Sequence, residues 1–193
     1  MTKQVPFTAF LLVLIAFLFC HRAVAQTNTV YTSDNTIFLT LDGVKQPFPF
    51  ASNALLVNYN KATQKLECRL NVSTLLPVDP APTPEMAYEV LYAAKYPELY
   101  MEIDLPANQI NSTNLVNSEP VPRVIRITLQ GATNETVVPV AFVRDKGTLV
   151  FSTSFDLMLE NFQATIPVKY VPLLTGRVLF TIRGARYTNY DAR

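Results

Sequence analysis

The chain has 193 residues, and its 16 lysines and arginines nearly balance its 15 acidic residues, giving a formal net charge of +1. This balance does not indicate a nucleic-acid-binding protein or a polybasic segment that binds membranes. The length is typical of one domain with enough residues to bury a core.

Residues 1–25 have the three parts of a secretory signal peptide. Lys3 supplies the positive charge, residues 10–19 form an unbroken apolar run, and residues 23–25 form the small-residue cleavage motif Ala-Val-Ala. We therefore predict cleavage before Gln26. The apolar run is shorter than a segment that spans a bilayer comfortably.

The predicted product is one domain of residues 26–193, exported to the periplasm or secreted. The leader carries two basic residues and no acidic residue, so its loss changes the formal net charge from +1 to −1. Cys20 could indicate a lipoprotein, but lipid attachment requires small residues directly before the cysteine, and residues 17–19 are Phe-Leu-Phe. Simple cleavage is therefore the favoured interpretation.

The predicted mature chain lacks residues on which many catalytic and metal sites depend. His21, the single histidine, is lost with the leader, and the sequence has no tryptophan. Nucleophiles activated by histidine, histidine general bases and metals bound by histidine are therefore excluded. The five glycines form no phosphate-binding loop. We expect no cofactor, no metal and no enzyme activity.

Cysteine and carboxylate chemistry needs separate consideration. Cys68 alternates with Leu66 and Leu70, which predicts a buried strand position and not a nucleophile. Acidic side chains could still meet in space and act as a pair; the candidates are Asp79, Glu85, Glu89, Glu102 and Asp104. The last two alternate with apolar residues, so we expect them on a solvated strand face.

Several segments have the residue pattern of β-strands, and turn residues separate most of them. They cover residues 36–41, 54–59, 64–72, 99–105, 123–129, 136–143, 148–157 and 177–183. The stretch VIRITLQGATNETVVPVAF, residues 124–142, contains two alternating runs on either side of Gly131 and predicts two neighbouring strands. Many short strands joined by turns predict a mainly β fold, either an antiparallel barrel or a sandwich.

One segment has the pattern of a helix. Thr83 is a possible N-cap, Pro84 follows at the first helical position, and Tyr96-Pro97 ends the segment. One apolar face at helical spacing is predicted; it consists of Met86, Ala87, Val90, Leu91 and Ala94. A single amphipathic helix in a β protein is expected to close a barrel end or to cover an opening.

Four stretches carry a family resemblance. They are SNALLVNYNKATQKLECRLNVSTL, EMAYEVLYAAKYPELYMEIDL, IRITLQGATNETVVPVAF and FSTSFDLMLENFQATIP, and they lie within residues 31–183. Their order resembles the early hairpin, helix, later hairpin and following strand of the YceI-like family, exported barrels that bind polyisoprenoid lipids. The resemblance implies a lipocalin-like antiparallel β-barrel of about eight strands with one amphipathic helix. It also implies a hydrophobic small molecule, an isoprenoid or fatty acyl lipid, as the partner.

A barrel of this size has an interior wide enough for one small ligand. Met101, Phe151, Phe155 and Phe180 are the residues that we select to line such a cavity, because large or adaptable apolar groups can follow a chain-like ligand. The alternative is that they are ordinary packed core. Arginines could neutralise a lipid phosphate at the mouth or could simply be solvated; they are Arg123, Arg126, Arg177, Arg183 and Arg186.

Three functions remain open at this point. An exported, non-catalytic protein that carries or stores a lipid is the first, and a structural or interaction barrel filled by its own side chains is the second. An enzyme is the third and is disfavoured by the missing histidine and nucleophile motifs. Large apolar residues fill a core as well as they line a pocket, so the sequence does not separate the first two.

Overall fold

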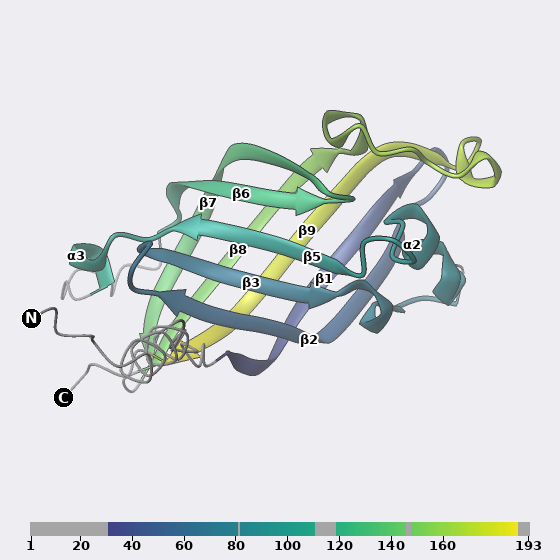
Figure 1. Cartoon of the computed structure of the whole chain (residues 1–193). Helices are drawn as coiled ribbons and strands as arrows, with labels where there is room; N and C mark the ends of the chain where they lie inside the picture. The colour runs from purple at the N-terminus through teal and green to yellow at the C-terminus, as the bar shows by residue number, and fades with distance from the viewer. Residues whose placement is uncertain (1–30, 81, 111–118, 146–147, 189–193) are drawn as a thin grey trace, which may run out of the picture.

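The structure, a computed structural model, describes residues 31–80, 82–110, 119–145 and 148–188, and it shows a closed β-barrel (Figure 1). Eight strands are hydrogen-bonded in the order β1-β9-β8-β7-β6-β5-β3-β2, and β2 pairs again with β1 to close the sheet. All of these pairings are antiparallel. The predicted fold class, a mainly β antiparallel barrel of eight strands, is confirmed.

The strands are β1 (Thr32–Gly43), β2 (Phe48–Asn60), β3 (Lys65–Asn71), β4 (Leu76–Pro77), β5 (Glu98–Asp104), β6 (Val121–Leu129), β7 (Ala132–Asp145), β8 (Thr148–Met158) and β9 (Leu174–Thr188). The helices are α2 (Pro84–Val90) and α3 (Ala107–Ile110), and short 3-10 turns are η1 (Val72–Thr74), η3 (Leu159–Phe162) and η4 (Val168–Tyr170). β4 pairs with β2 and lies outside the barrel order.

Each segment predicted to be a strand is one, although several are longer than their pattern indicated. β2 covers residues 48–60 where the pattern predicted 54–59, and β9 covers 174–188 where it predicted 177–183. Alternation fails at the ends of these strands because register shifts interrupt the pairing, as between Asn35 and Ile37 in β1. Within the regular parts the buried residues follow the expected period of two.

The turn around Gly131 joins β6 to β7, as predicted. Leu129 pairs with Ala132, so the loop consists of Gln130 and Gly131, and both have positive φ, 51° and 79°. Two residues with positive φ form the turn that matches the twist of a hairpin. A Cβ atom on Gly131 would lie 2.6 Å from the ring of Tyr96, so this glycine also permits close packing.

The helix forms at the predicted N-terminus but is shorter than predicted. α2 ends at Val90, and Tyr92 adopts a left-handed backbone with φ of 55°, which stops the helical repeat before the Tyr-Pro pair. The prediction that Ala94 belongs to the buried face is therefore wrong: Ala94 is exposed and Ala93 is buried in its place. Met86, Ala87, Val90 and Leu91 are buried as expected.

α2 lies at one end of the barrel (Figure 1) and is tied to two neighbouring segments. The Nε2 atom of Gln130, in the β6–β7 turn, donates a hydrogen bond to the Val90 carbonyl oxygen at 2.8 Å. Lys169 in η4 forms an ion pair with Glu89. These contacts hold the helix over this end of the barrel. Among the helices of the described part, none is long and apolar enough to cross a lipid bilayer.

Candidate functional site

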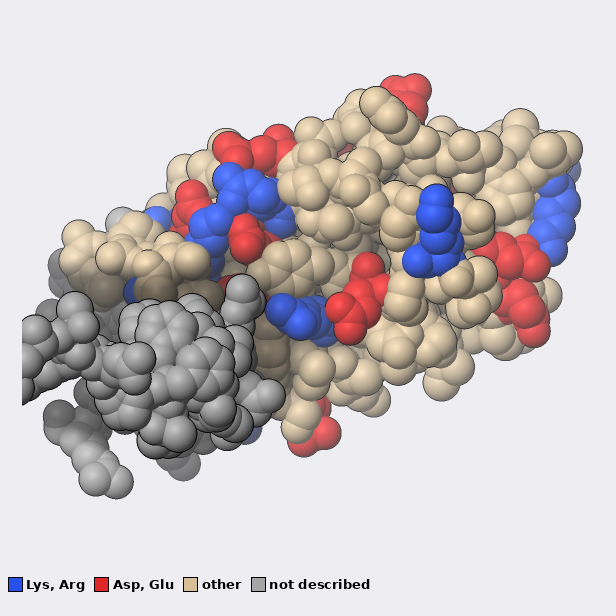
Figure 2. Space-filling model, in the orientation of Figure 1, with Lys and Arg blue, Asp and Glu red and all other residues tan. Residues whose placement is uncertain are grey.

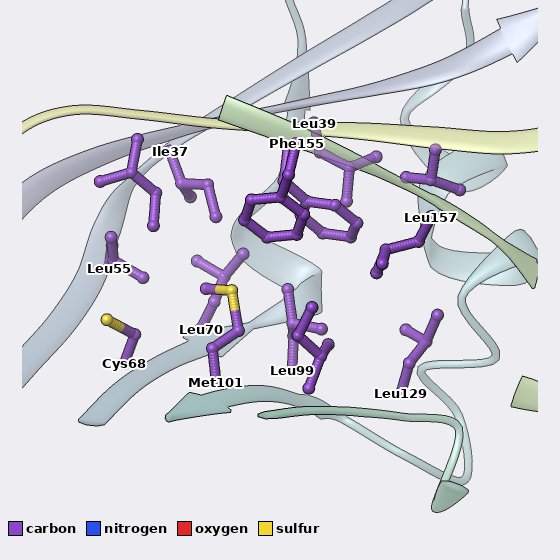
Figure 3. Close-up of a cluster of buried hydrophobic side chains, with 14 of the residues drawn as sticks. Ile37, Leu39, Leu55, Cys68, Leu70, Leu99, Met101, Leu129, Phe155 and Leu157 are labelled. Carbon is purple, nitrogen blue, oxygen red and sulfur yellow. The ribbon is translucent and has the colours of Figure 1, made fainter. Parts of the chain in front are cut away.

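The four residues predicted to line a cavity all point into the barrel. Met101 on β5, Phe151 on β8 and Phe180 on β9 have no exposed surface, and Phe155 on β8 is 9% exposed. Figure 3 shows Phe155 and Met101 projecting toward the interior from opposite walls. Alternation along each strand therefore identified the inner face correctly. Burial is equally compatible with packed core, so their role as ligand contacts stays a prediction.

The structure brings two of these four side chains into direct contact. The rings of Phe155 and Phe180 are stacked, with centroids 5.4 Å apart and planes 16° from parallel. Phe151 lies farther along β8 and packs instead against Phe142 of β7, with a centroid distance of 6.4 Å. Two of the buried inner positions of β8 are thus aromatic.

The rest of the interior is almost entirely apolar. Every strand of the barrel contributes buried hydrophobic side chains, among them Ile103, Ile125 and Val140. Figure 3 shows Ile37, Leu55 and Leu70 of the same interior. The buried Asn35 is bonded to the Thr32 and Arg186 carbonyl oxygens, and the buried Thr153 donates to the Pro139 carbonyl oxygen. Apart from Arg123 on the inner face of β6, the interior therefore interacts with a guest mainly through dispersion and the hydrophobic effect.

Cys68 is part of this interior and is not a nucleophile site. It is fully buried opposite Met101 in the β3–β5 ladder, as predicted. Burial raises the pKa of the Cys68 thiol far above its ordinary value, because the thiolate would lose its hydration. The nucleophilic form is therefore essentially unpopulated at neutral pH.

The acidic side chains form ion pairs on the outer wall. Glu102 accepts hydrogen bonds from Lys65 at 2.6 Å and from Arg126 at 3.0 Å. On this face, Figure 2 shows lysines and arginines beside acidic residues and no large basic patch. No group of three His, Cys, Asp or Glu side chains within the described ranges is close enough to hold a metal ion.

The candidate arginines divide into outward and inward residues. Arg126 and Arg177 point outward and are paired with Glu135 and Asp156, each at 2.7 Å. Arg123 instead shares the inner face of β6 with Ile125, and its guanidinium lies 5.9 Å from the ring centroid of Phe142. Its buried Nε atom has no hydrogen-bond partner in the described part of the chain, and burial lowers the pKa of Arg123.

The barrel wall is incomplete between β7 and β8. Their ladder extends from the Asp145–Thr148 pair to the Val140–Thr153 pair and stops there. Residues 132–139 of β7 pair only with β6, and residues 154–158 of β8 pair only with β9. The wall thus contains a gap bordered by two strand segments, which we call the β7–β8 gap.

Two local features explain why the strands separate at this point. Pro139 follows the last bonded residue on β7 and has no N–H group to continue a ladder. The β8–β9 register shifts between Phe151 and Thr153, with the extra residue on β9, so the sheet bends beside the point where the β7–β8 ladder stops. Pro139 in the sequence VVPVAF was the available signal for this gap, and the sequence interpretation did not use it.

A cleft of about 220 Å³ lies at the gap. Its apolar side chains are Ile127, Leu157, Met158 and Phe162, of which the first two belong to the inner faces of β6 and β8. The turn η3 follows β8 and covers the cleft, and the Nδ2 atom of Asn134 on β7 donates to the Asn161 carbonyl oxygen at 2.9 Å. The cleft therefore reaches the barrel interior from the side.

The sequence matches no protein-family model and no curated protein. Solved structures do match: a polyisoprenoid binding domain from Saccharophagus degradans, implicated in plant cell wall breakdown, superimposes with a TM-score of 0.64. The match covers 82% of this chain and 100% of that domain at 7% sequence identity. The chain therefore shares its fold with that domain.

Two further solved structures match the chain. Burkholderia cenocepacia BcnA matches with a TM-score of 0.56 and 14% identity, covering 76% of this chain and 93% of that one. The Campylobacter jejuni YceI protein has 11% identity over 98% of this chain and 100% of that one, with a TM-score of only 0.46. The fold implied by the family resemblance is confirmed by the first two structures.

Proposed function

We propose that this chain is an exported, non-catalytic protein that holds one long isoprenoid or fatty acyl chain inside its barrel as a carrier or store. The observation that carries the proposal is the match to a polyisoprenoid binding domain over that domain's full length. The apolar interior supports it, because its buried polar groups Asn35 and Thr153 are already hydrogen-bonded. The residue complement supports the non-catalytic role, since the proposed mature chain lacks histidine.

Hydrophobic burial alone is sufficient for useful affinity. Burying roughly 500 Å² of ligand surface at about 25 cal/mol per Å² gives on the order of 12 kcal/mol before the costs of association. The proposed tail contacts are Met101, Phe151, Phe155 and Phe180. The stacked pair must separate or shift to admit a chain, and the flexible thioether of Met101 can follow that change.

A structural or interaction barrel without a ligand is the second candidate. The specific observation in its favour is the packing of the interior, where Phe180 is fully buried against Phe155 and needs no guest to exclude water. The two candidates differ in one measurable respect. A carrier exchanges its internal contacts for ligand contacts, whereas a structural barrel keeps them.

Native mass spectrometry and organic extraction of the purified protein test the proposal directly. We expect a copurifying lipid, and saturable binding of a polyprenyl phosphate or a long-chain fatty acid in titrations. The sequence has no tryptophan, so Phe155→Trp places a unique indole reporter inside the barrel. Its emission should change with the same saturation curve as ligand binding.

The matched control is Leu56→Trp on the outer face of β2, where the side chain is 37% exposed. Its emission should not respond to ligand. Absence of copurifying lipid together with absence of saturable binding would remove the carrier function and favour the structural barrel. Export is tested by mass spectrometry of the mature N-terminus: Gln26 is expected, and a lipid on Cys20 would contradict the proposed cleavage.

A further inference from the structure

We propose that the β7–β8 gap is the entrance of the barrel and the place where the polar head of its ligand binds. This inference rests on the proposed function and deepens it. The tail would pass sideways between the two strands into the interior. A hydroxyl head would remain at the gap, donating a hydrogen bond to the Asn134 Oδ1 atom and accepting one from the Thr136 hydroxyl.

The first argument is that the gap joins the outside to the apolar interior. Leu157 lines the cleft and shares the inner face of β8 with Phe155. Both are 9% exposed, whereas Met101, Phe151 and Phe180 have no exposed surface. A chain that enters the cleft therefore meets the stacked Phe155–Phe180 pair with no polar layer between them.

The second argument is a change in the inner row of β7. Where β7 pairs with β8, this row holds the buried apolar residues Val140 and Phe142. The buried Val138 follows just beyond the last pair. The same row continues as Thr136 and Asn134 where β8 has separated, and both line the cleft. Polar side chains thus replace apolar ones at the position where a head group would stop.

These two side chains have hydrogen-bonding capacity to offer. Asn134 uses its Nδ2 atom on Asn161, but its Oδ1 atom accepts no hydrogen bond from the described residues. Thr136 Oγ1 likewise makes none within that part of the chain. The neighbouring carboxylates Glu135 and Asp156 are occupied by Arg126 and Arg177. The groups available to a head are therefore an amide oxygen and a hydroxyl.

The third argument compares what covers the α2 end of the barrel with what covers the β7–β8 gap. The α2 end is held by the Gln130–Val90 hydrogen bond and the Glu89–Lys169 ion pair. The gap is covered by η3, a turn of four residues whose C-cap, Gln163, has a left-handed backbone with φ of 53°. η3 has two buried side chains and a strained end, whereas α2 has three buried side chains besides its two ties, so η3 has fewer contacts to break when it opens. Opening of η3 would expose the cleft without disturbing the ladders.

A disulfide that fixes η3 to β7 tests the entrance. The variant Asn134→Cys/Asn161→Cys replaces the existing contact, and Thr128→Cys/Thr133→Cys is the matched control across the β6–β7 pair, whose hydroxyl oxygens are 2.9 Å apart. Protein purified after export is used, with each disulfide verified by mass spectrometry. Uptake of cis-parinaric acid is followed by stopped-flow fluorescence.

Oxidation of the Asn134/Asn161 variant should slow uptake at least about tenfold, and reduction should reverse the slowing, because association that requires a conformational opening is slowed when that opening is blocked. Oxidation of the control should have no effect. Normal binding with unchanged rates in both oxidised variants would overturn the entrance and leave the proposed function intact. Absence of saturable binding even in the reduced and unmodified proteins would instead overturn the proposed function and this inference together.

The head-group site has its own test. Thr136→Val should weaken geranylgeraniol binding roughly fivefold, the effect of one lost hydrogen bond, and should leave binding of the headless hydrocarbon squalene unchanged. Thr133→Val, an exposed position on the same strand, is the control and should alter neither. Equal effects of Thr136→Val on both ligands, or no effect on geranylgeraniol, would place the head elsewhere.

Discussion

Glu102 is the centre of a charge cluster on the outer wall, with Lys65, Arg126 and Tyr100 as hydrogen-bond donors. Partial burial alone would raise the pKa of Glu102, but the donors from Lys65 and Arg126 outweigh it and hold the pKa below 4.5. A lowered folded pKa stabilises the fold above the unfolded pKa, and this contribution is lost as the pH falls through the folded value. Glu102→Gln should therefore lower the free energy of unfolding at neutral pH by about 1 kcal/mol.

Urea denaturation between neutral pH and pH about 3 measures this effect. The difference between wild type and Glu102→Gln should shrink as the pH falls, because protonation removes the same charge from the wild type. Glu98→Gln, at an exposed position of the same strand, is the control and should behave like wild type. A constant difference at all pH values would show that packing, and not charge, is responsible.

The sequence could predict which single residues of the candidate site face the barrel interior wherever apolar and polar residues alternate regularly along a strand. Met101 and Phe180 lie in regular strands, so their inward direction followed from the positions of their neighbours. Arg123 shows the limit of this reasoning. The same alternation places it inside, yet its charge favours the outside, and the sequence interpretation gave more weight to charge than to register. Its position beside Phe142 depends on a contact between strands that no local pattern reveals.

The β6–β7 turn and α2 depend on each other through Gly131 and Tyr96. Gly131→Ala would both strain a left-handed backbone and place a methyl group against the Tyr96 ring. We expect a loss of about 2 kcal/mol or more in the free energy of unfolding. Chemical denaturation measures the loss, and increased susceptibility of residues 84–96 to limited proteolysis would show that α2 is released.

Gly176→Ala separates the two causes. Gly176 has a similar φ, 87°, but its added methyl would meet Ile166 at an ordinary distance of 3.7 Å. Backbone strain alone should cost about 1 kcal/mol there. If Gly131→Ala costs no more than Gly176→Ala, the packing of Tyr96 against the turn does not contribute to stability.

At the level of elements, the sequence predicted which strands and helices form better than it predicted where they end. α2 was expected to continue to Tyr96, but its end is set by the left-handed Tyr92, and a non-glycine residue in that conformation leaves no local signal. The β7–β8 gap was likewise missed. Each strand was identified correctly. Which residues pair across two strands depends on the register, however, and a single proline in β7 was the visible sign that the β7–β8 pairing would end.

For the whole molecule, Cys68 reports on global unfolding. Its side chain is fully buried inside the wall, and burial raises the pKa of the thiol, so reaction with Ellman's reagent requires the barrel to open. In protein lacking residues 1–25, the labelling rate should therefore rise with urea in parallel with unfolding measured by circular dichroism. Rapid labelling of Cys68 in native buffer would contradict a single closed core.

Phe162→Cys in a Cys68→Ser background provides the comparison. Phe162 is only 2% exposed, yet it belongs to η3 and covers the cleft. Local opening of η3 should expose this thiol far more often than global unfolding exposes Cys68. Equal labelling rates at the two positions would mean that η3 opens only with the whole barrel.

The incomplete pairing of β7 and β8 has a consequence for behaviour at high concentration. Closure of a barrel normally abolishes strand edges, which are templates for aggregation, but here residues 132–139 and 154–158 each keep one edge without a neighbouring strand. Glu135 and Asp156 place charges beside these edges, and Pro139 interrupts one of them. When η3 is displaced, copies of the chain could add to one another strand by strand at this position, so conditions that neutralise those two carboxylates should favour fibrous association over simple precipitation.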